Sequence, residues 1–324
     1  LRTTLFGIES LKAGVTTLVD DVLETPGQDH EQLAAVFDAY EQLGVRANIS
    51  GHVNNRPFLD TVPFAEEYLP GDVVRESRSA HVPSTDEYLR FAREAFAAHH
   101  GRANGRLRFM VAPSAPQRCE PALLTGATEM ALEFGAECHI HVLETKTQLV
   151  TGDESYGGSL VSYMASIGAL SPHTTLAHGI WLTDADMQTV AAAGTSISHN
   201  PISNLKLGSG IAAWRKLQDA GVNLGLGTDG CSHSDSPRML AVVKTAALLH
   251  KVTGPDIDQW PTVAEVLAAA TIGGARSAVL DDVVGSLEVG KQADLVIYDL
   301  ETMAFTPRQK LDLQLVYSEN GSAI

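Results

Sequence analysis

Cysteine is scarce in this sequence, and its scarcity excludes two kinds of scaffold. Only Cys119, Cys138 and Cys231 occur in 324 residues, and none stands in a CxxC spacing. Three widely spaced cysteines provide neither a disulfide framework nor a cysteine zinc site. We therefore expect a reducing compartment, and so a cytoplasmic protein.

Long apolar runs and an excess of basic residues are also missing. No run of about 18 apolar residues exists that would predict a transmembrane helix, and the N-terminus does not read as a signal peptide. Lys and Arg number 23 against 39 Asp and Glu, a net charge of −16. Phosphate binding needs a basic face, so we expect neither nucleic acid nor a membrane surface as a partner. The apolar fraction of 44% excludes a disordered chain.

What the sequence does have is a regular alternation of short apolar runs and amphipathic stretches. Strands are expected at Thr16–Asp21, Arg46–Val53, Leu107–Ala115, Glu137–Thr145, Thr174–Leu182, Thr195–Ser203 and Asn223–Ser232. Helices are expected at Asp29–Leu43, Asp86–His99, Pro121–Phe134, Asp184–Ala193, Ile211–Ala220 and Val263–Ser277. Such alternation predicts βαβ units and a parallel sheet.

Seven strands are one fewer than a (β/α)8 barrel contains, and a doubly wound sheet is the rival fold. The barrel accounts better for the position of the polar residues, which gather at the C-terminal ends of the strands. We assign residues 1–280 to an α/β (β/α)8 TIM barrel that lacks its first strand. The alternation of strands and helices stops in residues 281–324. Within them, Gly285–Leu300 suggests two short β runs at the edge of a small β-sandwich domain.

Four polar residues at strand ends are candidates for chemistry. His141 ends one apolar strand, with Glu144 just beyond it, and His178 ends the next. Asp229 follows the apolar run NLGLG, where a buried carboxylate needs a partner such as a metal ion. Imidazole is a good ligand for zinc or iron, and a nearby carboxylate moves protons. His139, two residues before His141, is interpreted as a hydrogen-bonded histidine of the barrel interior.

Six segments in family order resemble the amidohydrolase superfamily, within the group of cytosine, guanine and methylthioadenosine deaminases and triazine hydrolases. They are GVTTLVDD (Gly14–Asp21), HIHVLET (His139–Thr145), LAHGIWLTDADM (Leu176–Met187), SHNPISNLKLGSG (Ser198–Gly210), GLGTDG (Gly225–Gly230) and GSLEVGKQADLVIYD (Gly285–Asp299). Together they cover nearly the whole chain.

The resemblance implies a role for each candidate. His141 is similar to the metal-binding histidine of the fifth barrel strand, and Glu144 to the carboxylate that carries protons to a ring nitrogen. His178 is similar to the histidine that orients the attacking hydroxide and binds metal in some members. Asp229 is similar to the aspartate that is both metal ligand and general base.

The resemblance also suggests where the substrate would lie. The substrate-binding candidates are Ser114, Gln117, Trp181, Asn204 and His233. The segment with His199, Pro201 and Ser203 is interpreted as shaping the pocket. His233 and Asp235 lie where the pocket wall would be, and either substrate contact or solvation would explain them.

Three departures from the family qualify these expectations. No His-x-His pair precedes Gly14, and residue 1 is Leu, so we expect a fragment whose first strand, with two metal ligands, lies upstream. Ser114 stands where purine-nucleoside-type members have histidine, which argues against methylthioadenosine or S-adenosylhomocysteine as substrate. The strand Leu107–Ala115 contains no Lys, which favours one metal ion rather than two.

We therefore predict a metal-dependent deaminase that releases ammonia from a small amino-substituted N-heterocycle, with one Zn or Fe ion. A homo-oligomer is the family expectation. The alternative enzyme is a triazine-type hydrolase that displaces chloride or an alkylamine. An inactive fragment or a non-catalytic binding protein is the alternative outside enzymes.

Overall fold

The protein is described here by a computed structural model, which covers residues 1–23 and 29–324. Its centre is a parallel seven-stranded sheet with the strands in sequence order, β1-β2-β3-β4-β5-β6-β7. The strands are β1 Thr17–Asp20, β2 Arg46–Val53, β3 Leu107–Pro113, β4 Cys138–Val142, β5 Thr174–His178, β6 Ser196–His199 and β7 Leu224–Leu226. All seven predicted strands are confirmed, although most are shorter than expected at their C-terminal ends.

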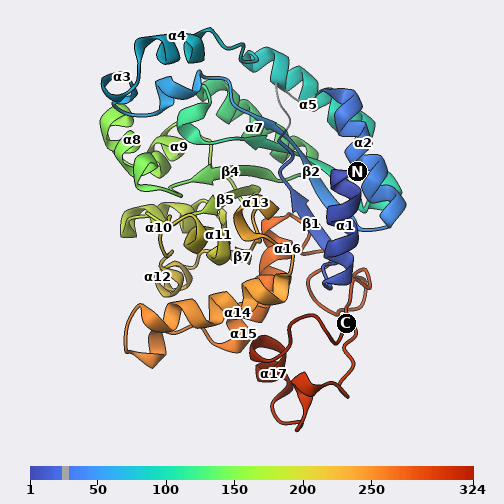
Figure 1. Ribbon diagram of the computed structural model, residues 1–324. Coiled ribbons are helices and arrows are strands. Elements are labelled where there is room, and N and C mark those ends of the chain that lie inside the picture. The colour runs from blue at the N-terminus through green and yellow to red at the C-terminus, as the bar shows by residue number, and fades with distance from the viewer. Residues whose placement is uncertain (24–28) are drawn as a thin grey trace.

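The connections between strands are helical and lie on the outside of the curled sheet (Figure 1). The helices of the first half are α1 Arg2–Lys12, α2 His30–Leu43, α3 Ala65–Tyr68, α4 Gly71–Ser79, α5 Thr85–His99, α6 Arg102–Gly105 and α7 Pro121–Phe134. Those of the second half are α8 Lys146–Tyr156, α9 Leu160–Ser166, α10 Asp184–Ala192, α11 Pro201–Lys206, α12 Trp214–Asp219, α13 Cys231–Ser234, α14 Met239–Leu249, α15 Val263–Ala268, α16 Gly274–Ser277 and α17 Leu311–Tyr317. The arrangement confirms the barrel-type α/β fold.

Local sequence signals set the helix boundaries. Capping boxes begin α2 at Asp29 and α5 at Ser84, where each side chain accepts from the third helical amide. Gly44 and Gly135 end α2 and α7 in the left-handed conformation that glycine adopts most easily. The expected strand Thr195–Ser203 was too long, because Pro201 starts helix α11.

The core lies between the sheet and its helices, with one aromatic cluster at its centre. The Phe96 ring of α5 lies 4.9 Å from that of Phe109 on β3 and 4.2 Å from that of Phe134 on α7, centroid to centroid. Aromatic pairs of this kind add about 0.5–1.5 kcal/mol each beyond the buried area. These contacts pack α5 and α7 against β3, which is the neighbour of β4 in the sheet. The core therefore supports the strands whose ends carry the candidate site.

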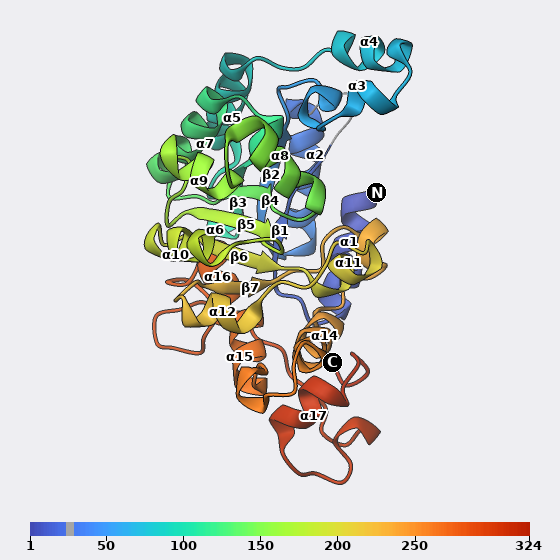
Figure 2. The same cartoon turned by 90° about the vertical axis from the view of Figure 1, so that its left-hand side faces the viewer.

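The sheet bends round as the strands succeed one another (Figure 2). In the part of the chain that the structure describes, no backbone pairing joins β1 to β7, so the sheet is open between its first and last strands. None of the described helices combines the length and apolar character that crossing a bilayer requires.

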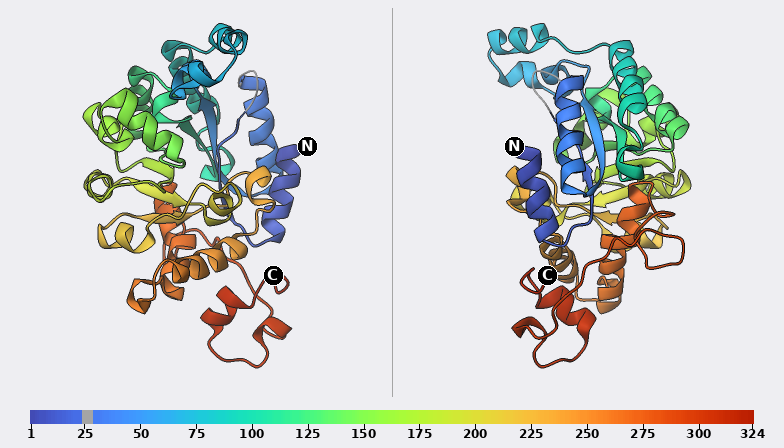
Figure 3. Two further views of the ribbon diagram at one scale, coloured as in Figure 1. Left: turned by 60° about the vertical axis from the view of Figure 1, so that its left-hand side comes forward. Right: turned by 90° about the vertical axis from the view of Figure 1, so that its right-hand side faces the viewer.

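Residues 281–324 are the last part of the chain, and their final portion, which includes helix α17 and is drawn in red, lies at the lower end of the molecule (Figure 3). The prediction of two β runs in Gly285–Leu300 is wrong for this structure, since the described residues there form no strand and no neighbouring strand pairs with them. An ion pair attaches this segment to the sheet, because the Arg46 Nε lies 2.8 Å from the Asp294 carboxylate. Arg46 starts β2, so the attachment is at the end of the sheet opposite the candidate site. The assignment of 281–324 to a partial β-sandwich stays a prediction.

Candidate active site

Three of the predicted site residues come from strand ends at one edge of the sheet. His141 and His178 belong to the neighbouring strands β4 and β5, which pair Val142 with His178. Their ring centroids are 5.7 Å apart. Asp229 follows β7. His178 is among the groups that lower the pKa of Asp229, so these two side chains are close enough to interact electrostatically. The carboxyl ends of parallel strands meet at one rim, which is where barrel enzymes build their sites.

His141 is held in a single tautomer by the backbone. Its Nδ1 lies 2.9 Å from the carbonyl oxygen of Ser114, which can only accept, so Nδ1 carries the proton. Burial lowers the pKa of His141 to about 4, with nearby His139 and His178 adding to the shift and Asp21 opposing it. The ring is therefore neutral at pH 7, and Nε2 presents a lone pair, as a metal ligand requires.

His178 is fixed in a similar way by a side chain. Its Nδ1 lies 2.8 Å from Oδ1 of Asn204 on α11. The side chain is buried, and its backbone has a φ of +74°, in the left-handed region that non-glycine residues rarely adopt. Asp229 has a φ of +60°. Strain of this kind is concentrated at functional sites, and here it affects two predicted site residues.

Asp229 is kept ionised by hydrogen bonds. Ser203 donates to its Oδ2 over 2.5 Å, and the Gly230 amide donates to its Oδ1 over 2.7 Å. Burial alone would raise the pKa of Asp229, but these two bonds, with His178 and His233, lower it overall. The His233 Nδ1 lies 3.3 Å from Oδ1 of Asp229, so the structure brings these two predicted residues together.

The close packing of this end of the sheet depends on a glycine. A Cβ on Gly227 would lie 2.3 Å from Oδ1 of Asn200 and 2.9 Å from the Ser198 hydroxyl. The side-chain nitrogen of Asn200, Nδ2, lies 3.5 Å from Nδ1 of His178. Gly227 thus leaves room for the side chains that surround His178.

Glu144 is half-buried beyond β4. No described residue forms a hydrogen bond with its carboxylate, whereas its amide nitrogen donates to Oε1 of Gln148 over 2.7 Å. Burial lowers the pKa of Arg118, and Glu144 opposes that shift, so the two charges are near each other. A carboxylate without a fixed partner is suited to carrying protons.

The other predicted substrate-binding residues are placed as follows. Ser114 is buried, with its hydroxyl oxygen 3.4 Å from Nη1 of Arg118. Gln117 is buried too, and its Oε1 has no hydrogen-bond partner. The indole of Trp181 donates to the carbonyl of Ser209 over 2.9 Å, and Lys146 lies over its ring.

Two further predictions concern neighbours of these residues. His139 lies with its Nδ1 3.1 Å from Oε1 of the buried Glu137, in agreement with its interpretation as an interior histidine. Asp235 is exposed, and its carboxylate accepts a hydrogen bond from Nζ of Lys206 over 2.6 Å. This ion pair, rather than a contact with Asp229, occupies the Asp235 carboxylate.

A second group at the same rim was missed by the sequence reasoning. Asp21 follows β1, and its Oδ2 lies 2.8 Å from Nδ1 of His52 on β2. Ser50 donates to Oδ1 of Asp21 over 2.7 Å. The signal was available, because Asp21 and His52 are polar residues at the ends of predicted strands, like His141 and His178.

The donors at this rim fit a divalent metal in kind but do not form a complete set of ligands. His141 and His178 each offer an imidazole nitrogen, and Asp229 offers an ionised carboxylate, all suitable for zinc or iron. Within residues 1–23 and 29–324, however, no group of three His, Cys, Asp or Glu side chains is arranged to hold a metal ion. A metal here needs at least one further ligand.

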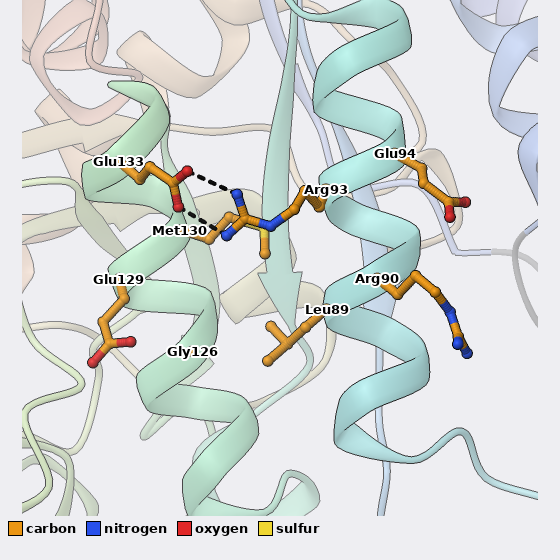
Figure 4. A pocket seen from close by; sticks show the side chains of 8 residues that line it. All are labelled: Leu89, Arg90, Arg93, Glu94, Gly126, Glu129, Met130 and Glu133. Atoms are coloured by element: carbon orange, nitrogen blue, oxygen red, sulfur yellow. Dashed lines mark hydrogen bonds and ion pairs between the residues drawn. The ribbon is translucent and has the colours of Figure 1, made fainter.

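A separate groove lies on the surface between α5 and α7 (Figure 4). Its volume is about 480 Å³, and Arg93 and Glu133 form a bidentate ion pair across it. Leu89 faces Gly126 from the opposite helix. None of the predicted site residues lines this groove, and it lies on the outside of the sheet.

The Amidohydrolase family profile matches residues 3–321, almost the entire chain. The chain belongs to the amidohydrolase family. This confirms the resemblance drawn from the six sequence segments, and it agrees with the rim site described above.

Several named amidohydrolases are similar to the chain. A 5'-deoxyadenosine deaminase of Methanosarcina acetivorans is 41% identical over 224 residues, which are 69% of this chain and 51% of that protein. A 5-methylthioadenosine/S-adenosylhomocysteine deaminase of Desulforudis audaxviator is 35% identical over 97% of this chain and 65% of its own length. The chain thus spans between half and two thirds of the length of these two relatives.

Solved structures of the amidohydrolase type support the fold. An adenosine deaminase from Xanthomonas campestris with bound zinc has a TM-score of 0.83 and 29% identity, over 98% of this chain and 65% of that one. An atrazine chlorohydrolase from Arthrobacter aurescens complexed with zinc has a TM-score of 0.87, covering 99% of this chain and 68% of that one. At 24% identity, the second likeness concerns the fold alone.

Proposed function

We propose that this protein contributes the site of a metal-dependent hydrolase that removes an amino group from a nitrogen heterocycle and releases ammonia. The observation that carries the proposal is the rim arrangement of His141, His178 and Asp229, in which both rings have a fixed tautomer and the carboxylate is ionised. The deaminase names of the relatives support the same reaction class.

The metal would be held by His141, His178 and Asp229 together with ligands outside the described set. When bound, a divalent cation supplies Lewis acidity that lowers the pKa of water to about 7. The zinc in the Xanthomonas relative favours zinc here, and iron is the alternative to be tested by metal analysis.

The protein's own side chains would then handle the protons. Asp229, which is ionised, accepts a proton from water, while His178 orients the oxygen that bonds to the amine-bearing ring carbon. Glu144, which enters the step carrying a proton, donates it to the adjacent ring nitrogen, and no described residue occupies its carboxyl group by a hydrogen bond. The proton that Asp229 took from water then passes to the amine, the carbon–nitrogen bond breaks and ammonia leaves. Glu144 regains its proton from the added hydroxyl group, whose oxygen becomes the carbonyl oxygen of the product. Proton transfer of this kind contributes about 10²–10⁴-fold to a rate.

The substrate class favoured by the relatives is a 6-aminopurine nucleoside. Two of them are named for 5'-deoxyadenosine and for methylthioadenosine or S-adenosylhomocysteine. Ser114 stands where purine-nucleoside-type members have histidine, which speaks against the latter pair. We therefore place adenosine and 5'-deoxyadenosine first.

The triazine-type reaction is the second candidate within enzymes, because the same scaffold can add water to a chlorinated or alkylamino ring. A non-catalytic binding protein is the candidate of another class. We further propose a cytoplasmic homo-oligomer that acts on a small heterocycle, with neither nucleic acid nor membrane as partner.

A substrate panel tests the proposal. The complete protein is purified with zinc or iron, and ammonia release is measured with adenosine, 5'-deoxyadenosine, methylthioadenosine, cytosine, guanine and an aminotriazine. We expect the largest kcat/KM for a 6-aminopurine nucleoside. Chloride or alkylamine release without ammonia would favour the triazine reaction, and no turnover with a full metal complement would contradict the enzyme proposal.

A further inference from the structure

The unassigned group at the rim is the Ser50–Asp21–His52 relay, defined by the side chains of Ser50 and His52 on β2 and of Asp21, the residue that follows β1. Its hydrogen bonds converge on the Asp21 carboxylate. The Val22 amide donates to the Ser50 hydroxyl over 2.8 Å, Ser50 donates to Asp21 over 2.7 Å, and the other oxygen of Asp21 faces His52 over 2.8 Å. Such a chain fixes the orientation of the terminal imidazole.

The relay also determines which nitrogen of His52 is available. Burial alone would raise the pKa of Asp21, but adjacent His52 outweighs it, so that the pKa is well below its usual range. An ionised carboxylate only accepts, and so the proton of a neutral His52 ring lies on Nδ1. Its Nε2 then carries a lone pair, and no residue that the structure describes occupies that nitrogen.

His52 is a neighbour of the proposed metal ligands. Its ring centroid lies 6.2 Å from that of His141, which in turn lies 5.7 Å from His178. His52 is on β2 and His178 is on β5, and in the strand order these two strands lie on opposite sides of β4, which carries His141. The side chains of His52 and Asp21 are 10% and 16% exposed, so the described residues do not enclose the pair completely.

We propose that His52 is a substrate-binding residue whose Nε2 accepts a hydrogen bond from a hydroxyl group of the substrate, with Asp21 and Ser50 as its positioning residues. This rests on the proposed function. In a 6-aminopurine nucleoside the ribose hydroxyls are donors remote from the reacting amine, which matches a position beyond His141. The relay would therefore select nucleosides over free bases.

The test compares substrates that differ only in hydroxyl groups. In the complete, metal-loaded protein, kcat and KM are measured with 5'-deoxyadenosine and with 2',3',5'-trideoxyadenosine, for wild type and His52→Leu. Loss of one hydrogen bond changes affinity by about tenfold. We expect His52→Leu to raise KM about tenfold for 5'-deoxyadenosine with little change for the trideoxy compound. His52→Gln, which keeps an acceptor, should recover part of the loss, and Asp21→Asn should have an intermediate effect.

Further measurements separate this inference from a merely structural role. His81→Gln, a substitution of an exposed histidine, is the matched control and should leave both KM values unchanged. Metal content and thermal stability are recorded for each variant. An equal loss for both substrates, or loss of metal in His52→Leu, would overturn the inference. If neither compound is deaminated, the proposed function fails, and equilibrium binding of the two nucleosides then decides the role of His52 on its own.

Discussion

The hydroxyl of Ser203 lies 2.5 Å from Oδ2 of Asp229, and this bond joins α11 to the end of β7. It is the foremost of the groups that lower the pKa of Asp229 against the effect of burial. Asp229 must be ionised to accept a proton, so Ser203 controls the base although it need not touch the substrate. The consequence can be measured in a pH profile.

Ser203→Ala should raise the pKa of Asp229 and move the acid limb of kcat/KM to higher pH. Loss of a hydrogen bond to a charged group costs about 1.5–3 kcal/mol, so activity near that limb should fall at least about tenfold. Ser203→Thr, which keeps the hydroxyl, should behave like the wild type. Ser166→Ala, at an exposed site on α9, is the control. An unchanged acid limb in Ser203→Ala would contradict the assignment of Asp229 as base.

Asp229→Asn should abolish most turnover while leaving the fold intact. The amide has nearly the same shape as the carboxylate but cannot accept the proton, so we expect a loss of at least about a hundredfold in kcat. Circular dichroism and thermal unfolding check the fold. Undiminished turnover would exclude the proposed mechanism.

The sequence was sufficient to predict the sheet and most of the rim. Apolar runs ending in polar residues located His141, His178 and Asp229, because parallel strands place such residues at one edge. Asp21 and His52 obey the same rule, and Asp21 ends one of the six family-like segments, but the resemblance implies a role for neither of them.

What the sequence could not predict depends on partners far away in the chain. The bonds of Asn204 to His178 and of Ser203 to Asp229 depend on the start of α11, where a long strand was expected. The apolar alternation of Gly285–Leu300 predicted strands, but a strand needs a neighbour for its backbone groups, and none pairs with it here.

A buried histidine pair should make stability depend on pH. His199 and His250 lie with their Nε2 atoms 3.2 Å apart. Burial, together with the charges of His250 and His178, lowers the pKa of His199 to about 3. Burial lowers the pKa of His250 to about 4. Both pKa values are below the usual value of about 6.5, so the unfolded chain binds more protons below that pH.

The free energy of unfolding should therefore fall as pH decreases from about 6.5 to about 4. Each histidine contributes a slope of up to about 1.4 kcal/mol per pH unit. Urea unfolding at several pH values measures this slope. His250→Gln, which removes one titrating ring, should make it shallower, and the exposed control His81→Gln should not. An equal slope in wild type and His250→Gln would show that the pair does not cause it.

Asn204 should act on activity through the tautomer of His178. Its Oδ1 accepts from Nδ1 of His178 over 2.8 Å, which leaves Nε2 as the nitrogen available to metal or substrate. Asn204→Leu removes the acceptor, so the ring can turn or change tautomer, and outer partners of metal-binding histidines typically account for about 10–100-fold in affinity or activity. We expect a loss in that range, with weaker metal retention measured by dialysis against a chelator.

Asn204→Asp keeps an acceptor at the same position and should retain metal better than Asn204→Leu. If Asn204→Leu keeps full metal and loses only substrate affinity, Asn204 contacts the substrate, as the sequence first suggested.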